Sequence, residues 1–198
     1  MRRQLPAAIL MLFVMTILTG ALYPLVVTGI AHAAFSSPAN GSMITSSGRV
    51  VGSSLIGQTF TDARGNPLPQ YFQPRPSAAG SSGYDPTASG GSNLGPSNPK
   101  FLAAVADRVA VYRTFNGLAP SARVPIDAVT ASASGLDPDI SLANALDQAP
   151  RVARARGLPV DQVVALVKAH VRNRAWDFLG ENTVNVLLLN LALDEVSR

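Results

Sequence analysis

The sequence contains no cysteine, only two histidines, and only two lysines, Lys100 and Lys168. The absence of cysteine excludes disulfide frameworks, thiol catalysis, thiolate zinc sites and iron–sulfur clusters. The formal net charge is only +4, and so few lysines give no basic stripe of the kind that nucleic-acid-binding proteins present. His32 and His170 are too few for a histidine-rich metal site. We therefore expect no nucleic-acid partner and no metal site.

Charged side chains are also missing from the first part of the chain. No Asp, Glu, Lys or Arg lies between Arg3 and Arg49. As an α-helix, the apolar run of residues 7–27 would span roughly 31 Å, the thickness of the hydrocarbon core of a bilayer. We therefore predict an N-terminal transmembrane anchor within residues 1–34. Because Arg2 and Arg3 should stay in the cytoplasm, the rest of the chain is expected on the opposite side of the membrane.

Two other interpretations of the apolar run compete with an uncleaved anchor. The tripeptide Ala31-His32-Ala33 fits the cleavage pattern of a signal peptide. However, the apolar part of a signal peptide runs about 7–15 residues, and this run is longer. A core helix of a soluble protein would show a polar face, which this run lacks. The length of the run favours an uncleaved anchor.

Three residues at four-residue spacing, Thr16, Gly20 and Pro24, fall on one face of the expected helix. A stripe of small residues lets a second membrane helix approach closely. Such spacings also arise by chance, because Thr and Gly are common in membrane helices. The stripe gives a weak indication of a helical partner in the membrane.

The remainder of the chain divides into a tether and a domain. Residues 35–48 are rich in Ser, Gly, Pro and Asn and are predicted to form the tether. Residues 49–198 are predicted to form one extracytoplasmic domain of the α+β class, because strand-like runs come early and helical patterns late. Residues 77–99 hold few large apolar side chains and fit either a disordered linker or an ordered loop.

The expected elements of this domain follow from periodicity and from start and stop residues. We expect strands within residues 49–60, 70–72 and 124–131. Four helices are expected, and their start signals are Asn98, Ser141 or Asp139, a valine pattern from Val160, and Asn182 or Thr183. Gly117 should end one of these helices. Pro150 should break another, with residues 151–156 as a following turn that Gly157 closes.

A glycine-rich loop invites comparison with phosphate-binding loops. No Lys follows its glycines and the required spacing is absent, so that interpretation fails. We expect an ordered structural or docking element, in which the glycines adopt backbone angles that a Cβ disfavours and an asparagine bonds to nearby main chain. The residues of this loop are Ser89, Gly90, Gly91, Ser92, Asn93 and Gly95.

The residues show no catalytic constellation. Asp137 and Asp139 lack the longer ligand set of an EF-hand calcium loop, and turn chemistry explains them better. No serine lies in a nucleophile elbow, and His170 is the only histidine of the expected domain. A membrane-anchored extracytoplasmic hydrolase stays open as an alternative that enzymatic assay would test.

The order and spacing of several motifs resemble one known family nearly end to end. They include GSSLIGQ at 52–58, SGGSNLGP at 89–96 and LNLALD at 189–194. With the segments 19–24, 71–77, 124–137, 148–153 and 184–186, they make the sequence similar to the C subunit of the bacterial potassium-transporting P-type ATPase, the Kdp system. Each motif alone is weak, but their combination is specific.

The resemblance implies a non-catalytic accessory subunit of an ATP-driven potassium uptake complex in the bacterial cell membrane. Its implied partners are a pore-forming, potassium-binding subunit and a P-type subunit that hydrolyses ATP. The subunit is implied to support assembly and to act as a catalytic chaperone that raises the affinity of the P-type subunit for ATP. Within the resembling segments, Gln148 and Arg151 are candidate partner contacts.

The resemblance implies no cofactor for the chain itself. ATP, with magnesium, and potassium would belong to the complex. Because ATP is cytoplasmic and the domain is expected outside, no residue is assigned to nucleotide.

Overall fold

A computed structural model describes residues 4–196, so Arg2 and Arg3, on which the predicted orientation depends, lie outside the described residues. The chain forms two compact units, one up to Val51 and one from Gly52 onward. The second unit is called the domain below. As expected, the protein combines an apolar N-terminal helix with a mixed helix-and-sheet domain of the α+β class.

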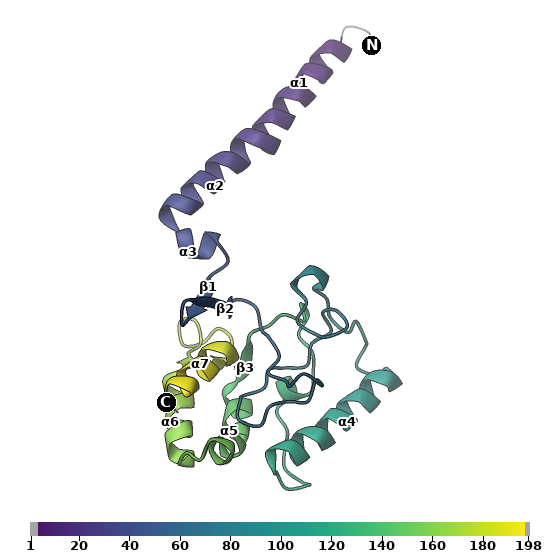
Figure 1. Cartoon of the computed structure of the whole chain (residues 1–198). Helices are drawn as coiled ribbons and strands as arrows, with labels where there is room; N and C mark the ends of the chain where they lie inside the picture. The colour runs from purple at the N-terminus through teal and green to yellow at the C-terminus, as the bar shows by residue number, and fades with distance from the viewer. Residues whose placement is uncertain (1–3, 197–198) are drawn as a thin grey trace. The chain divides into compact units, whose positions relative to one another are not determined.

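The first unit is dominated by one helical rod (Figure 1). It consists of α1 (Leu5–Ile17), the π-helical turn η1 (Leu18–Leu22) and α2 (Tyr23–Ala34). Over its 30 residues an 18-residue window reaches a mean hydropathy of 2.3, and none of that window is buried in the structure. An apolar surface of this length is what a single membrane-spanning helix requires. A short helix α3 (Ser36–Ala39) and the hairpin of β1 (Met43–Ser46) and β2 (Arg49–Ser53) follow.

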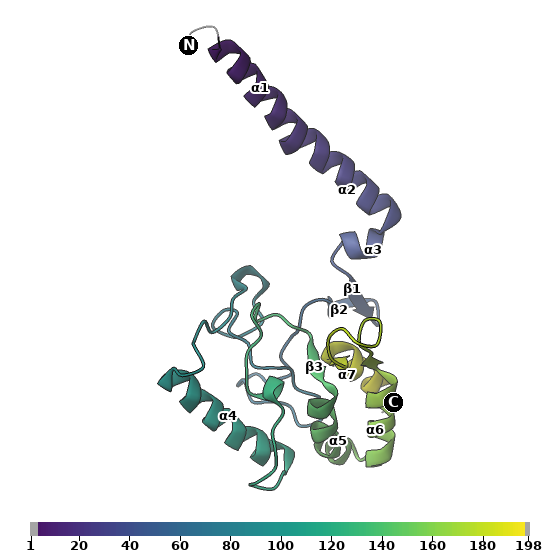
Figure 2. The ribbon, with the colours of Figure 1, turned by 180° about the vertical axis from the view of Figure 1, so that it is seen from behind.

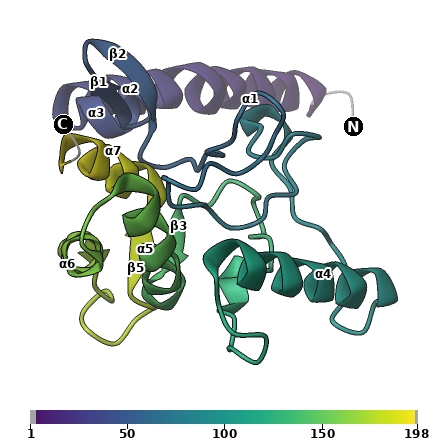
Figure 3. The same ribbon diagram turned by 60° about the horizontal axis from the view of Figure 1, so that its bottom comes forward.

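The domain packs helices around a small antiparallel sheet with the strand order β3-β5-β4. In the register, Ile140 lies opposite Val184, and Val184 lies opposite Val171. Seen from behind and from below, α4 lies on the side of the domain away from α6 (Figures 2 and 3). The elements are η2 (Pro86–Ala88), α4 (Pro99–Asn116), η3 (Ile126–Ala128), β3 (Asp139–Ser141), α5 (Leu142–Arg156), α6 (Val160–Ala169), β4 (Val171–Arg172), β5 (Thr183–Asn185) and α7 (Val186–Val196).

The predicted helix ends are confirmed where the signal is local. The Asn98 side chain accepts a hydrogen bond from the Lys100 N–H at 2.9 Å, which caps α4, and Ser141 caps α5 in the same way. Gly117 follows the last residue of α4 with φ of 68°, as predicted. Gly157, with φ of 67°, ends α5 itself and not a separate turn after Pro150. A left-handed residue at this position closes a helix, and glycine adopts it without steric cost.

Four predicted elements are wrong, each because tertiary packing overrides a local signal. Pro150 does not break α5, since Ala149 and Val152 on either side of it are fully buried and hold the helix in the core. The segment 124–131 is not a strand: it contains the 3₁₀ turn η3. Asp127 in this turn accepts hydrogen bonds from the N–H and the hydroxyl of Ser141, each at 2.8 Å, so the turn is fixed to the start of α5.

The third correction concerns the last helix. Residues 183–185 pair with two strands as β5, and Val184 is fully buried there. The helix α7 therefore begins at Val186, and the Asn185 side chain accepts a hydrogen bond from the Leu188 N–H at 3.1 Å.

The core lies between α5, α6, α7 and the sheet. Its largest residue is Phe72, which reaches it from a segment without regular secondary structure and not from the strand predicted over 70–72. The buried members are Phe72, Ile140, Ala145, Ala149, Val152, Ala153, Val163, Val167, Val184, Val186, Leu189 and Leu193.

Candidate functional site

The segment before the glycine-rich loop is ordered by hydrogen bonds from within the domain. The Ser77 hydroxyl donates to the Gly135 carbonyl at 2.6 Å and accepts from the Tyr84 N–H at 2.8 Å. The Tyr84 hydroxyl donates to the Arg75 carbonyl at 2.8 Å. Burial, followed by the nearby Asp137 carboxylate, raises the pKa of Tyr84 above its usual value. Of the two interpretations of residues 77–99, the structure supports an ordered loop.

The glycine-rich loop itself is attached to residues 132–135. The Ser89 hydroxyl and the Gly90 N–H both donate to the Ser134 carbonyl, at 3.0 Å and 2.8 Å. A Cβ on Gly91 would lie 3.1 Å from the Ala133 carbonyl oxygen, which is tighter than ordinary contact. Beyond these points of attachment, residues 92–96 are exposed. The loop thus presents an ordered, solvent-facing edge.

The glycines of this loop do not adopt the unusual backbone angles that were expected of them. Gly90, Gly91 and Gly95 do not have positive φ, and the left-handed residue of the loop is Asn93, with φ of 53°. Close approach of the two backbones, and not an unusual backbone angle, explains Gly91.

Gly135, across this contact, carries the strongest constraint. Its φ is 69°, and a Cβ there would lie 2.6 Å from the Gly90 carbonyl oxygen. Both the backbone angle and the space therefore require glycine at position 135. The loop's place in the domain depends on this residue.

Gln148 and Arg151, the candidate partner contacts, lie inside the domain and not on its surface. Gln148 is 2% exposed and Arg151 is 5% exposed. The Arg151 guanidinium donates to the Asn116 side chain at 2.9 Å and to Gln148 at 2.7 Å, and it also bonds to the Tyr71 and Pro69 carbonyls. These contacts leave no face of the two side chains for a partner, which corrects the expectation.

The Arg151 charge is held without an acidic partner among its hydrogen bonds. Its guanidinium lies over the Phe115 ring, 4.3 Å from the centroid, and its other neighbours are neutral oxygens. Burial lowers the pKa of Arg151 to about 10, so the group still carries its charge at neutral pH. The arrangement joins α4, α5 and the segment 69–73, and its role is structural.

In the membrane helix, Thr16, Gly20 and Pro24 lie around the π-helical turn η1. Pro24 has no N–H, and the Tyr23 N–H donates to the carbonyl of Leu18 five residues back. A Cβ on Gly20 would meet no atom within 4 Å. A wider turn with a bare glycine surface offers a close approach to another helix.

The carboxylates and the histidine singled out in the sequence pair with other groups of the domain. Asp137 pairs with Arg75 at 2.8 Å, and Asp139 accepts from Arg172 at 3.2 Å. The His170 Nδ1 lies 2.9 Å from the Leu166 carbonyl oxygen. Within residues 4–196, no group of three or more His, Asp or Glu side chains is placed to hold a metal ion.

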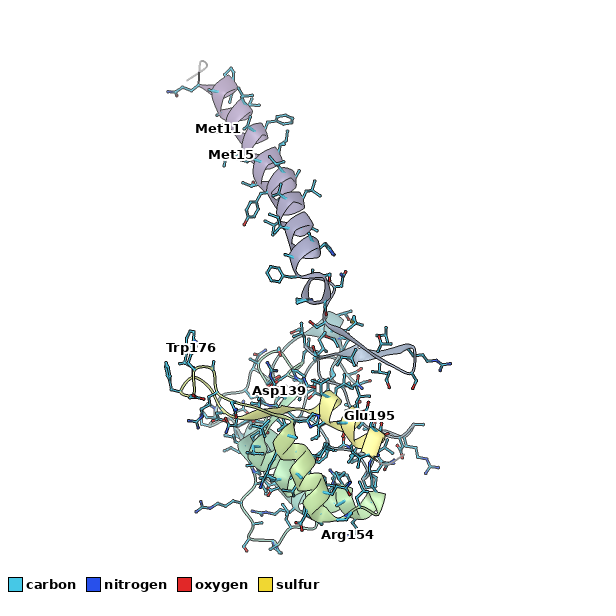
Figure 4. The ribbon with its side chains drawn as sticks, turned by 90° about the vertical axis from the view of Figure 1, so that its left-hand side faces the viewer. Met11, Met15, Asp139, Arg154, Trp176 and Glu195 are labelled. Atoms are coloured by element: carbon cyan, nitrogen blue, oxygen red, sulfur yellow. The ribbon has the colours of Figure 1, made fainter. Side chains whose placement is uncertain are left out.

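One exposed feature, the loop between β4 and β5, was not predicted from the sequence. Trp176 and Phe178 are 80% and 70% exposed, and Figure 4 shows Trp176 at the outer end of this loop. The sequence does contain a signal for this loop. Three large apolar residues lie between Arg174 and Gly180, in a segment without helical or strand periodicity that would bury them.

Comparison with known proteins places these features in a family. Residues 5–195 match the family described as the K+-transporting ATPase, c chain (KdpC). The Potassium-transporting ATPase KdpC subunit of Mycobacterium tuberculosis (strain ATCC 25618 / H37Rv) is 55% identical over 196 residues, which cover 99% of this chain and 100% of the relative. Those of Geotalea uraniireducens (51%, 99% and 100% covered) and Geobacter sulfurreducens (52%, 97% of each) are similar over nearly the same length. The chain therefore belongs to the KdpC family of K+-transporting ATPase subunits.

Proposed function

We propose that this chain is a non-catalytic, single-pass subunit that assembles with a pore-forming, potassium-binding subunit and an ATP-hydrolysing P-type subunit. The similarity to KdpC subunits over 97–99% of the chain carries the proposal. The apolar helix Leu5–Ala34 supports it, because a subunit of a membrane transporter needs such an anchor. ATP, magnesium and potassium are then ligands of the complex and not of this chain.

The domain is proposed to lie on the extracytoplasmic side of the bacterial cell membrane. The support is the pair Arg2 and Arg3 before the apolar run, since basic residues stay on the cytoplasmic side of a membrane helix. Labelling of single cysteines tests this orientation, because the chain has no cysteine of its own. In intact cells, a membrane-impermeant thiol reagent should label Ser81→Cys and should not label Gln4→Cys.

We further propose that the chain raises the ATP affinity of the P-type subunit from a distance. A domain outside the cell cannot contact cytoplasmic ATP, so the effect requires a coupling between two sites. The chain would bind the ATP-competent conformation of the complex more tightly than the other conformations and would thereby raise its population. By reciprocity, ATP would then strengthen the binding of this chain to the complex.

Purification of the full-length tagged chain from detergent-solubilised membranes tests the assembly. Identification of co-purified proteins should return a potassium-binding and a P-type subunit. Recovery of the chain alone, with hydrolase activity on ester or peptide substrates, would support the alternative function and contradict this one.

A further inference from the structure

The loop that connects β4 to β5, residues 173–182, carries the most exposed aromatic side chains of the domain's described part. Trp176 and Phe178 are 80% and 70% exposed, and their rings stack with centroids 6.4 Å apart. Leu179 beside them is also exposed. In Figure 4 the Trp176 side chain points away from the domain. A contiguous apolar patch of this kind on a protein surface usually marks an interaction site.

The backbone of the loop holds these rings in place. Ala175 and Leu179 exchange two backbone hydrogen bonds, each of 2.9 Å, and the Asp177 N–H donates to the Arg174 carbonyl at 3.2 Å. Trp176 and Asp177 both have positive φ, 52° and 64°, although neither is glycine. Aspartate tolerates left-handed backbone, but for a bulky residue such as Trp176 it is unfavourable, and strained backbone of this kind is concentrated at functional sites. The tight turn at the tip therefore fixes the presentation of the two rings to solvent.

The chemistry of the tip favours a protein over a lipid bilayer as its occupant. Asp177 stands between the two aromatic residues and is exposed with them. Insertion of the rings into hydrocarbon would carry this carboxylate with them, and a charge in the bilayer interior is costly. A protein pocket can instead bury the rings and offer Arg, Lys or N–H groups to the carboxylate.

A polar rim lies next to the aromatic residues. Asn173, Arg174, Asp177 and Asn182 line a small, open depression in the loop. Aromatic anchors surrounded by polar side chains are the usual composition of the energetic centre of a protein–protein interface.

We propose that the loop 173–182 docks onto another protein subunit of the transport complex. An apolar pocket of that subunit takes the rings of Trp176 and Phe178, and a basic or N–H group at the rim of the pocket binds the Asp177 carboxylate. The inference rests on the proposed function, because it requires that the chain assembles with other subunits.

Paired variants of the full-length chain test the docking. In cells that express all subunits, Trp176→Ser with Phe178→Ser should lower the yield of co-purified subunits by at least about tenfold, as loss of two central anchors does at other interfaces. Asp177→Lys should lower it in the same direction. Val111→Ser with Ile126→Ser removes two apolar side chains that are 66% and 77% exposed elsewhere in the domain, and should retain the wild-type yield.

The outcomes separate this inference from the proposed function. Wild-type yield with both loop variants overturns the docking proposal and leaves the function standing. Failure of the wild-type chain itself to recover any transport subunit overturns the proposed function. An equal loss with the control pair would show that exposed apolar residues matter in general, which also overturns the docking proposal.

Tryptophan fluorescence tests the alternative that the loop inserts into a lipid bilayer. Trp176 is the only tryptophan of the chain, so its emission reports on the loop alone. The purified chain is reconstituted by itself into vesicles of phosphatidylethanolamine and phosphatidylglycerol that carry brominated acyl chains. Emission should equal that in unbrominated vesicles, because the ring stays in water without a protein partner. Strong quenching by the brominated chains would place the ring in the bilayer and overturn the proposal.

Discussion

Phe72 and Asn190 exchange two hydrogen bonds in the core of the domain. The Phe72 N–H donates to the Asn190 Oδ1 at 2.9 Å, and the Asn190 Nδ2 donates to the Phe72 carbonyl at 3.0 Å. The next residue, Gln73, is bonded in the same way. Its N–H donates to the Gln148 Oε1 at 2.8 Å, and the Gln148 Nε2 donates to its carbonyl at 3.0 Å. Two amide side chains from α7 and α5 thus take the place of a neighbouring strand, and they let an irregular segment enter the core with its backbone satisfied.

Replacement of Asn190 by Leu should destabilise the domain strongly. The side chains are similar in size, but Leu leaves the buried N–H and carbonyl of Phe72 without partners. We expect the free energy of unfolding to fall by about 2–4 kcal/mol, measured by denaturant titration of the full chain in detergent. Asn173→Leu, at an exposed position, is the matched control and should stay within about 0.5 kcal/mol of wild type.

Gly91→Val should weaken the attachment of the glycine-rich loop. Its branched side chain would meet the Ala133 carbonyl, and the two backbones would have to separate. The yield of the assembled complex, or growth at low external potassium, should fall. Ser82→Val, at an exposed position of the preceding segment, should change neither. Equal tolerance at both positions would show that residues 89–96 serve only as a linker.

Tyr84 should make the domain less stable at alkaline pH. Because burial raises its pKa in the folded state, the folded chain keeps the phenol proton while the unfolded chain loses it above about pH 10. The resulting contribution to stability is complete below about pH 10 and is lost as the pH rises further. Tyr84→Phe should therefore show a shallower decline of unfolding free energy between about pH 9 and about pH 11.

The buried Arg151 changes the stability of the domain in the opposite direction over the same alkaline pH range. Burial lowers its pKa to about 10, so the folded state releases this proton before the unfolded state does, and the group favours folding as the pH rises. If the unfolding free energy of Tyr84→Phe declined with pH as steeply as that of wild type, the assignment of this decline to Tyr84 would be contradicted.

Gly20→Leu should reduce assembly while leaving membrane insertion intact. The substitution makes the helix more apolar, so insertion is favoured, but it fills the bare surface beside η1 where a second helix would approach. Quantification of the chain in the membrane fraction and of co-purified subunits separates the two effects. Gly29→Leu, a glycine with equally open surroundings outside the stripe, is the matched control. Wild-type yield of the complex with Gly20→Leu would show that the stripe of small residues has no role in assembly.

Features that depend on neighbouring residues could be predicted from the sequence. The apolar helix follows from an uninterrupted run, both ends of α4 follow from Asn98 and Gly117, and the start of α5 follows from Ser141. The α+β class followed from the order of the patterns. β2 lies within the expected region 49–60, but β3, β4 and β5 lie where no strand was expected.

Features that depend on residues far apart in the chain could not be predicted from the sequence. Gln148 bonds to residue 73 and Arg151 to residues 69 and 71, some 75 to 82 positions earlier in the chain, so their burial has no local signal. The reason for Gly91 lies in Ala133 and was likewise hidden. The exposure of Trp176 could not be predicted for another reason, because a tight turn that displays aromatic side chains has no periodic pattern in the sequence.

Potassium-stimulated ATP hydrolysis by the complex, purified from cells with and without this chain, tests the accessory role most directly. Adding the purified full-length chain to the complex that lacks it should restore hydrolysis and lower the ATP concentration needed for half-maximal rate. The chain alone should hydrolyse no ATP. Equal hydrolysis and equal ATP dependence with and without the chain would contradict the account.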